Sequence, residues 1–294
     1  MTSMPPSPVK RPKSDLCKLT GTLGPYVKSH IIPASLTRLP TNGQKIVEVG
    51  IGLGVKKRFV SWYDNELVTR VGEDILEEID TPAIEILRGH KLIWSSWGEA
   101  ARLNTDDLQV DPSGVGLRLV NIARAKELQL FFLSLVWRSA VSQRHEFSYV
   151  QLTADTVEDL RNRVHAKDPG PLGDYPIQLF QIISKGILHN RVPSLERANL
   201  GLESGVLREM DYVRIYFDGL VAHIYLALRE SFDDMFFNTC LRMGEDTFIF
   251  SHEYEASRTA ANIKEMVATV VKEGVELPSR LTAIAAAVRG GRRT

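Results

Sequence analysis

The chain has 294 residues, of which 44% are hydrophobic and 24% are charged, and its formal net charge at pH 7 is +0. A chain of this length can bury a core in one or two domains without metal or disulfide staples, and this composition excludes global disorder. The two cysteines, Cys17 and Cys240, lie far apart in the sequence, which argues against a disulfide framework and favours a reducing, cytoplasmic location.

Residues 1–14 are rich in Pro, Ser, Lys and Arg and lack the apolar stretch of a secretory signal, so we expect a short disordered basic arm. Positive charge continues beyond it, because residues 1–72 hold eleven Lys or Arg against four Asp or Glu. Acidic residues dominate immediately afterwards. This basic lobe could attract phosphates or pair with its own acidic neighbour, and the sequence slightly favours self-pairing.

Short strands and turns are expected over residues 15–60, including a strand at 45–49. From Asp64 onwards, apolar residues recur at i, i+4 spacing, which predicts an amphipathic helix. Thr81-Pro82 is expected to end this helix and to start a second one that runs towards Leu92.

A polar connection at 104–116 predicts a boundary between a module at 15–103 and a C-terminal region at 104–294. Residues 117–142 form the longest helical candidate and are apolar on most faces, as in a central core helix. The most apolar run within it, residues 128–137, is far shorter than the ~20 residues that span a bilayer, so we expect no membrane segment. Asp155 is expected to cap a short helix that ends near Ala166.

The last third of the chain changes character. Residues 212–226 predict a β-hairpin, because Asp218-Gly219 readily supplies the positive φ angles of a type I′ turn. A further strand is expected at 247–251 and a helix at 256–273. The order of elements predicts an α+β fold, with a mixed helical and antiparallel-strand C-terminal region.

Three pieces of the N-terminal region form a pattern: Cys17-x-x-Thr20, Ser29-His30-Ile31-Ile32-Pro33 and Thr69-x-x-Gly72-Glu73. In this order they resemble a bacterial HNH-endonuclease-like family, in which two Cys-x-x-Cys knuckles bracket a Ser-His-Ile-Ile-Pro strand. The resemblance extends in patches to residues 131–138, which are similar to an apolar helix ending in Trp-Arg. It implies a degenerate HNH or treble-clef-like module in which Thr20, Thr69 and Gly72 replace zinc cysteines. Because tight zinc binding needs four ligands and only Cys17 remains, no structural zinc is expected.

The resemblance also implies nuclease chemistry. In an HNH nuclease the strand histidine is the general base that activates water, and a divalent ion stabilises the developing phosphorane charge. His30 matches the base, and Asp64 and Glu73 are the candidate ligands for Mg²⁺ or Mn²⁺. The alternative is that His30 is a hydrogen-bonded structural histidine and that Glu73 only complements a helix dipole.

Basic side chains near these pieces could contact nucleic acid. Trp62 and Tyr63 lie close by in the sequence and could stack on bases, although such basic stretches are more often a solvated surface. The candidate phosphate contacts are Lys28, Lys56, Lys57 and Arg58.

Two other interpretations stay open. The first is a pseudo-nuclease that keeps the fold and binds nucleic acid or a protein partner, the latter through the C-terminal region. The second is an S-adenosylmethionine-dependent methyltransferase, because Glu48 precedes the glycine loop Gly50-x-Gly52-x-Gly54. The methyltransferase interpretation lacks the next β-strand of a Rossmann fold, which should follow about 20 residues later.

Overall fold

The computed structural model describes residues 15–37, 46–49, 56–58, 62–187, 189–201, 207–228, 232 and 234–272. A seven-stranded sheet forms its centre, in the order β11-β12-β13-β9-β14-β8-β7. Adjacent strands are antiparallel except β14 and β9, which run parallel. The strands are β7 (Leu108–Val110), β8 (Val115–Asn121), β9 (Ile177–Ile182), β11 (Ser194–Gly201), β12 (Leu207–Phe217), β13 (Leu220–Tyr225) and β14 (Asp246–His252).

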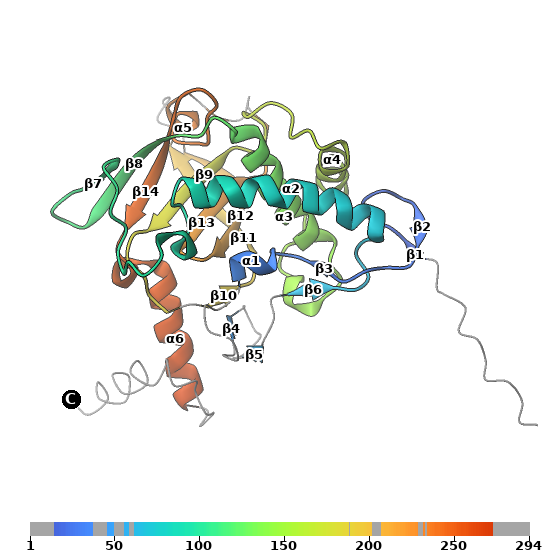
Figure 1. Ribbon diagram of the computed structural model, residues 1–294, viewed down its shortest axis with the longest axis horizontal. Helices are drawn as coiled ribbons and strands as arrows, with labels where there is room; N and C mark the ends of the chain where they lie inside the picture. The colour runs from blue at the N-terminus through green and yellow to red at the C-terminus, as the bar shows by residue number, and fades with distance from the viewer. Residues whose placement is uncertain are drawn as a thin grey trace, which may run out of the picture.

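Helices pack on this sheet in layers (Figure 1). Helix α3 (Ala125–Val141) lies against β13 and is covered in turn by α2 (Arg70–Gly89) and α4 (Ala154–Ala166). This position explains why α3 is apolar on most faces, whereas α2 is amphipathic. The remaining helices are α1 (Ala34–Thr37), α5 (Asp234–Phe237) and α6 (Arg258–Lys272), with 3₁₀ helices η1 (Trp94–Trp97), η2 (His145–Phe147) and η4 (Tyr254–Ala256). The predicted α+β class is therefore confirmed.

The N-terminal region consists of short paired strands. β1 (Asp15–Leu16) pairs with β2 (Leu23–Gly24), and β3 (Ser29–His30) pairs with β6 (Tyr63–Asp64). One hydrophobic core runs from Ile31 through α3 to Leu179 of the central sheet. Residues 15–103 and 104–294 thus share a core, and the expected boundary at 104–116 does not separate two cores.

A third small sheet bears on the methyltransferase interpretation. β4 (Ile46–Val49) pairs antiparallel with β5 (Lys56–Arg58) and parallel with β10 (Asn190–Arg191). Gly50, Gly52 and Gly54 lie outside the described residues. A Rossmann motif requires a helix after the first strand, whereas here the chain returns within a short segment as an antiparallel strand. This pairing disfavours a methyltransferase.

Most of the other predicted elements are present. The hairpin at 212–226 is formed by β12 and β13, and its turn residues Asp218 and Gly219 have φ angles of 47° and 83°. The strand at 247–251 and the helix at 256–273 correspond to β14 and α6. Within the described ranges, no helix combines the length and apolarity needed to cross a membrane.

Three predicted boundaries are wrong. The start of the central helix at 117–142 belongs to β8, whose alternating buried and outward residues give it the period of a strand. Pro82 does not divide α2, because buried residues before and after it, such as Ile79 and Ile86, hold both halves in one core. Thr153, rather than Asp155, caps α4, and its hydroxyl accepts a hydrogen bond from the Thr156 amide at 3.2 Å.

A buried arginine joins three of these elements. Arg138, near the end of α3, is only 1% exposed and pairs with both carboxylate oxygens of Asp80 on α2. Its Nη1 also donates to the His30 backbone carbonyl of β3 at 3.1 Å, and its Nη2 donates to the Ser134 hydroxyl at 2.8 Å. One guanidinium therefore fixes the positions of α2, α3 and β3.

We predict that Arg138→Met destabilises the protein by about 3–5 kcal/mol, because it leaves Asp80 and the His30 carbonyl without this partner inside the core. Chemical denaturation followed by circular dichroism measures the loss. Arg124→Met is the matched control, since Arg124 is exposed and water screens its pair with Glu127. Equal losses in the two variants would contradict the role given to Arg138.

Candidate functional site

The four positions expected from the knuckle pattern lie together. Cys17 follows β1 and Thr20 lies in the turn after it, whereas Thr69 precedes α2 and Gly72 lies in the first turn of α2. Backbone hydrogen bonds join the two segments, from the Lys18 amide to the Leu67 carbonyl at 3.1 Å and from the Val27 amide to the Val68 carbonyl at 3.0 Å. The spacing in the sequence thus corresponds to one location in the structure.

Close packing of the Cys17 sulfur explains the glycine at position 72. A Cβ atom added to Gly72 would lie 2.7 Å from the Cys17 Sγ and 2.9 Å from the Val68 Cβ. Real contacts of this kind are longer, so a larger side chain could fit only if its neighbours moved. The sulfur of Cys17 therefore occupies the space that a second ligand side chain would need.

The Cys17 thiol is buried but surrounded by donors. Burial alone raises the pKa of this thiol, whereas hydrogen bonds with Thr20 and Thr69 lower it, and the net shift is downwards from the usual value. Such bonds favour the thiolate, which is the form that binds metals. The hydrogen bonds around the Cys17 sulfur thus favour its negatively charged form.

The antiparallel strand pair β3–β6 places the residues predicted for catalysis on opposite faces. Ser29 lies opposite Asp64, and His30 lies opposite Tyr63. Directly opposed residues in a strand pair project to the same face, and successive residues project to opposite faces. Consequently His30 shares a face with Tyr63, whereas Asp64 projects from the other face.

Of the two candidate metal ligands, Asp64 is engaged in the interior, whereas Glu73 has one buried carboxylate oxygen, Oε2, without a hydrogen-bond partner among the described residues. The Asp64 carboxylate is buried and accepts hydrogen bonds from the Glu66 amide at 2.8 Å and from the Ser142 hydroxyl at 2.6 Å. Burial raises the pKa of Glu73, even though a hydrogen bond with Ser29 and the charge of Arg138 oppose the rise. Because Asp64 and His30 project from opposite faces of the β3–β6 pair, these two side chains are not directed at one common ion.

The face of the β3–β6 pair that carries His30 and Tyr63 holds a basic and aromatic cluster around Tyr63. The Lys28 Nζ lies 4.1 Å from the ring centroid and the Arg144 Cζ lies 5.9 Å from it. The His30 and Tyr63 rings meet edge to face, with their centroids 6.3 Å apart. Arg144 also donates to the Tyr63 backbone carbonyl at 2.8 Å. We call Lys28, His30, Tyr63 and Arg144 the Tyr63 cluster.

Sequence reasoning found three members of the Tyr63 cluster and missed Arg144. Arg144 follows α3 and is distant in the sequence from the hairpin that it joins, so no local pattern connects them. Of the other basic candidates, Lys56, Lys57 and Arg58 form β5, and only their backbone is described.

Among the residues that the structure describes, Arg70 is the member of the basic 1–72 lobe that pairs with an acid of the acidic helix. Acids of α2 pair with Arg70 of the same helix, with Arg124 before α3 and with Lys167 after α4. Lys28 instead lies over Tyr63, and the Lys18 Nζ donates to the Val141 carbonyl at 3.0 Å. The exposed ammonium of Lys28 is thus directed to an aromatic ring rather than to an acid of α2.

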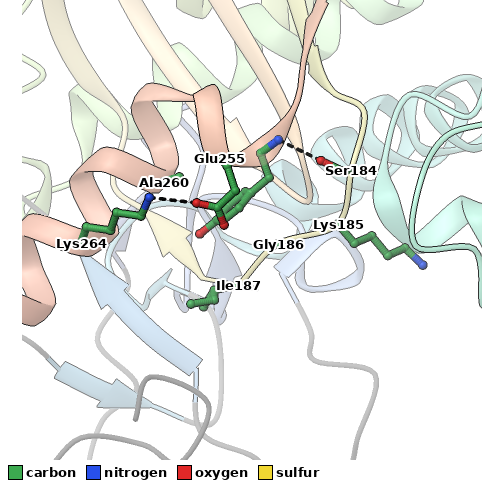
Figure 2. A pocket seen from close by; sticks show the side chains of 8 residues that line it. Ser184, Lys185, Gly186, Ile187, Glu255, Ala260 and Lys264 are labelled. Carbon is green, nitrogen blue, oxygen red and sulfur yellow. Dashed lines mark hydrogen bonds and ion pairs between the residues drawn. The ribbon is translucent and has the colours of Figure 1, made fainter. Parts of the chain in front are cut away.

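A separate pocket of about 230 Å³ lies where α6 meets the segment after β9 (Figure 2). Several of its polar groups are engaged: the Lys264 Nζ pairs with Glu255 at 2.8 Å, the Tyr254 amide donates to Ser184 and the Lys185 Nζ donates to the Gly98 carbonyl. The buried Tyr254 hydroxyl, also at this pocket, has no hydrogen-bond partner among the described residues.

Comparisons of the chain with protein-family models, with curated proteins and with solved structures found no match. Within the described ranges, no group of three or more His, Cys, Asp or Glu side chains is arranged to hold a metal ion. The two features of the geometry that bear on function are the close packing around Cys17 and the Tyr63 cluster.

We predict that Gly72→Ala destabilises the protein by about 1–3 kcal/mol, because the added methyl group overlaps with Cys17 and Val68. Thermal and urea unfolding measure the change, and Cys17→Ala in the same chain should restore part of the loss. Gly89→Ala, near the end of the same helix, meets nothing within 4 Å and should leave stability unchanged or raise it by up to about 1 kcal/mol. A tolerated alanine at position 72 would contradict the packing argument.

Proposed function

We propose that this protein binds nucleic acid through a degenerate HNH-like module at its N-terminus, without cleaving it. The observation that carries the proposal is the Tyr63 cluster, in which two cationic side chains and an imidazole surround a half-buried aromatic ring. Cationic groups bind phosphates, and an aromatic face stacks on bases with little dependence on sequence. The two buried free cysteines suit a cytoplasmic protein.

The arrangement around Cys17 supports the module assignment. A treble-clef module combines a knuckle, a hairpin and a helix that begins at the second pair of ligands. Here Cys17 and Thr20 lie against Thr69 and Gly72 at the start of α2, and His30 lies on the antiparallel pair β3–β6, whose two strands are separated in the chain by α1, β4 and β5. The resemblance in the sequence and the proximity in space are independent observations that agree.

The orientation of the hairpin favours binding over hydrolysis. Metal-assisted hydrolysis requires the base and the metal ligands to reach the same phosphate. His30 shares a face with Tyr63, whereas Asp64 and Glu73 belong to the interior face and are engaged with Ser142 and Ser29. We therefore favour the pseudo-nuclease over the active enzyme with His30 as general base.

We predict that the protein binds a fluorescently labelled oligonucleotide at low salt and that Lys28→Ala weakens this binding. Loss of one phosphate contact should reduce the slope of log K against log salt by about 1. Fluorescence anisotropy with single-stranded DNA, duplex DNA and single-stranded RNA measures affinity, slope and preference. Lys126→Ala removes an equally exposed charge at the start of α3 and serves as the matched control.

Two outcomes would overturn this function. If Lys28→Ala and Lys126→Ala weaken binding equally, the Tyr63 cluster is not part of the nucleic-acid interface. Cleavage of any of these substrates in Mg²⁺ or Mn²⁺, abolished by His30→Ala, would establish the nuclease instead of the binding protein.

We also predict that the zinc site can be restored. The variant Thr20→Cys/Thr69→Cys, which keeps Gly72 and its close contact with the Cys17 sulfur, should bind about one zinc ion per chain through three thiolates and one water. Zinc should raise the Tm of this variant and leave that of the wild type unchanged, since metal bound only to the folded state stabilises it. Cobalt substitution gives an absorption signature for the same site. Absence of bound metal in a folded variant would contradict the knuckle assignment.

A further inference from the structure

The face of the central sheet turned away from α3 carries polar and aromatic residues. Along β12, Val213, Ile215 and Phe217 belong to the core that includes α3, and the residues between them project to the other face. An apolar cluster formed with η1 and α6 lies at one end of that face, and a second cluster formed with α5 lies at the other. Between the two clusters lie Arg214 and His223, which are directly opposed on β12 and β13.

Arg214 is buried without full compensation of its charge. Its side chain is only 4% exposed, and its Nη1 atom has no hydrogen-bond partner among the described residues. Its Nη2 atom makes one long bond to the Thr259 hydroxyl, at 3.4 Å. Burial lowers the pKa of Arg214 to about 10, with the charge of Arg191 as the second cause, so the guanidinium stays ionised at neutral pH. Buried charges in proteins are normally paired.

The surrounding charges leave an excess of positive charge. Arg191, Arg214 and Arg258 are grouped around a single carboxylate, that of Glu196. This carboxylate already accepts hydrogen bonds from Arg258 at 2.6 Å, from the Tyr212 hydroxyl at 3.0 Å and from the Ser194 hydroxyl at 2.9 Å. Thr259 lies in the first turn of α6, where the helix dipole adds further positive potential. The site therefore favours an anion.

A row of neighbouring aromatic rings adjoins the Arg214 guanidinium. The ring centroids of Tyr212 and His223 are 4.4 Å apart, those of His223 and Phe180 are 4.6 Å apart, and those of Phe180 and Phe250 are 5.6 Å apart. His223, Phe180 and Phe250 are only half-buried. Burial, together with the charge of Arg214, lowers the pKa of His223 to about 3, so its ring is neutral and stacks as an aromatic. Such rings present flat faces to a planar ligand.

We propose that Arg214 and the His223–Phe180 ring pair form a binding site for a small molecule that carries an oxyanion beside a planar ring. The anion accepts hydrogen bonds from the Arg214 guanidinium, and the ring of the ligand stacks on His223 and Phe180. A phosphate on a nucleoside and a carboxylate on an aromatic acid share this chemistry. The site lies on the opposite face of the sheet from α3 and does not depend on the function proposed for the Tyr63 cluster.

Calorimetric titration of the full chain with adenosine monophosphate and with benzoate tests the site. At least one of the two should bind saturably, and the responding compound identifies a phosphate or a carboxylate as the anion. Adenosine, which lacks the anion, and inorganic phosphate, which lacks the ring, should bind at least about tenfold more weakly, because charged hydrogen bonds and stacking each contribute on that scale. Absence of binding by both adenosine monophosphate and benzoate would overturn the proposal.

Arg214→Met separates a ligand-binding arginine from a structural one. Binding should weaken by about tenfold or more, whereas the Tm of the ligand-free variant should stay equal or rise, because an incompletely paired buried charge is replaced by an apolar side chain. A structural arginine would instead lower the Tm, and that result would overturn the proposal. Arg197→Met, on the exposed edge of the same sheet, is the matched control and should bind as the wild type does.

Discussion

The fold depends on the contact between Arg138 and its partners on α2 and β3. α3 lies between the central sheet and the N-terminal region. The polar side chain near its end, Arg138, must therefore find its partners inside the core. The Arg138 guanidinium does so by pairing with Asp80 and by donating to the His30 carbonyl. The His30 ring shares the face of the β3–β6 pair that carries Tyr63, and the two rings meet edge to face. The buried ion pair therefore holds in place the strand from which His30 projects.

The same core holds the short N-terminal strands in place, and in the degenerate module proposed above it would do so without a full set of zinc ligands. In small zinc modules, metal binding supplies much of the folding free energy. Here Leu19, Ile31 and Leu67 are fully buried in the core that also contains α3. Each buried side chain of this size contributes about 1.5–3 kcal/mol from desolvation. Burial against α3 can thus replace the free energy that a zinc ion would supply, and Gly72 leaves the room that the Cys17 sulfur occupies.

Local signals in the sequence predicted local structure. The turn at Asp218-Gly219 identified the β12–β13 hairpin because its positive φ angles need those residue types. The spacing of Cys17, Thr20, Thr69 and Gly72 identified positions that lie together. The strand β8 was mistaken for helix, since its apolar residues continue into those of α3 and periodicity over so short a run cannot separate the two.

Long-range contacts escaped prediction for a different reason. Arg144 joins the Tyr63 cluster across many residues, and the Arg214 site combines β10, β11, β12 and α6, so only the folded chain brings these groups together. Without related sequences, residues that meet in this way leave no local pattern.

The placement of charge, rather than the net charge, distinguishes the Tyr63 cluster from the Arg214 site. The chain is neutral overall, and the acids of α2 are neutralised by nearby Arg and Lys side chains on α2 itself and beside α3 and α4. Lys28 lies instead beside an aromatic ring at the surface, where phosphate could approach it with bulk water present, and Arg144 beside the same ring pairs with Glu146. Arg214 lies beside aromatic rings in the interior, where electrostatic interactions are stronger and an unpaired charge costs more. A polyanion that spreads over a surface suits the first environment, whereas a single small anion that becomes desolvated suits the second. The two proposed ligands thus differ in size because the two cationic environments differ in burial.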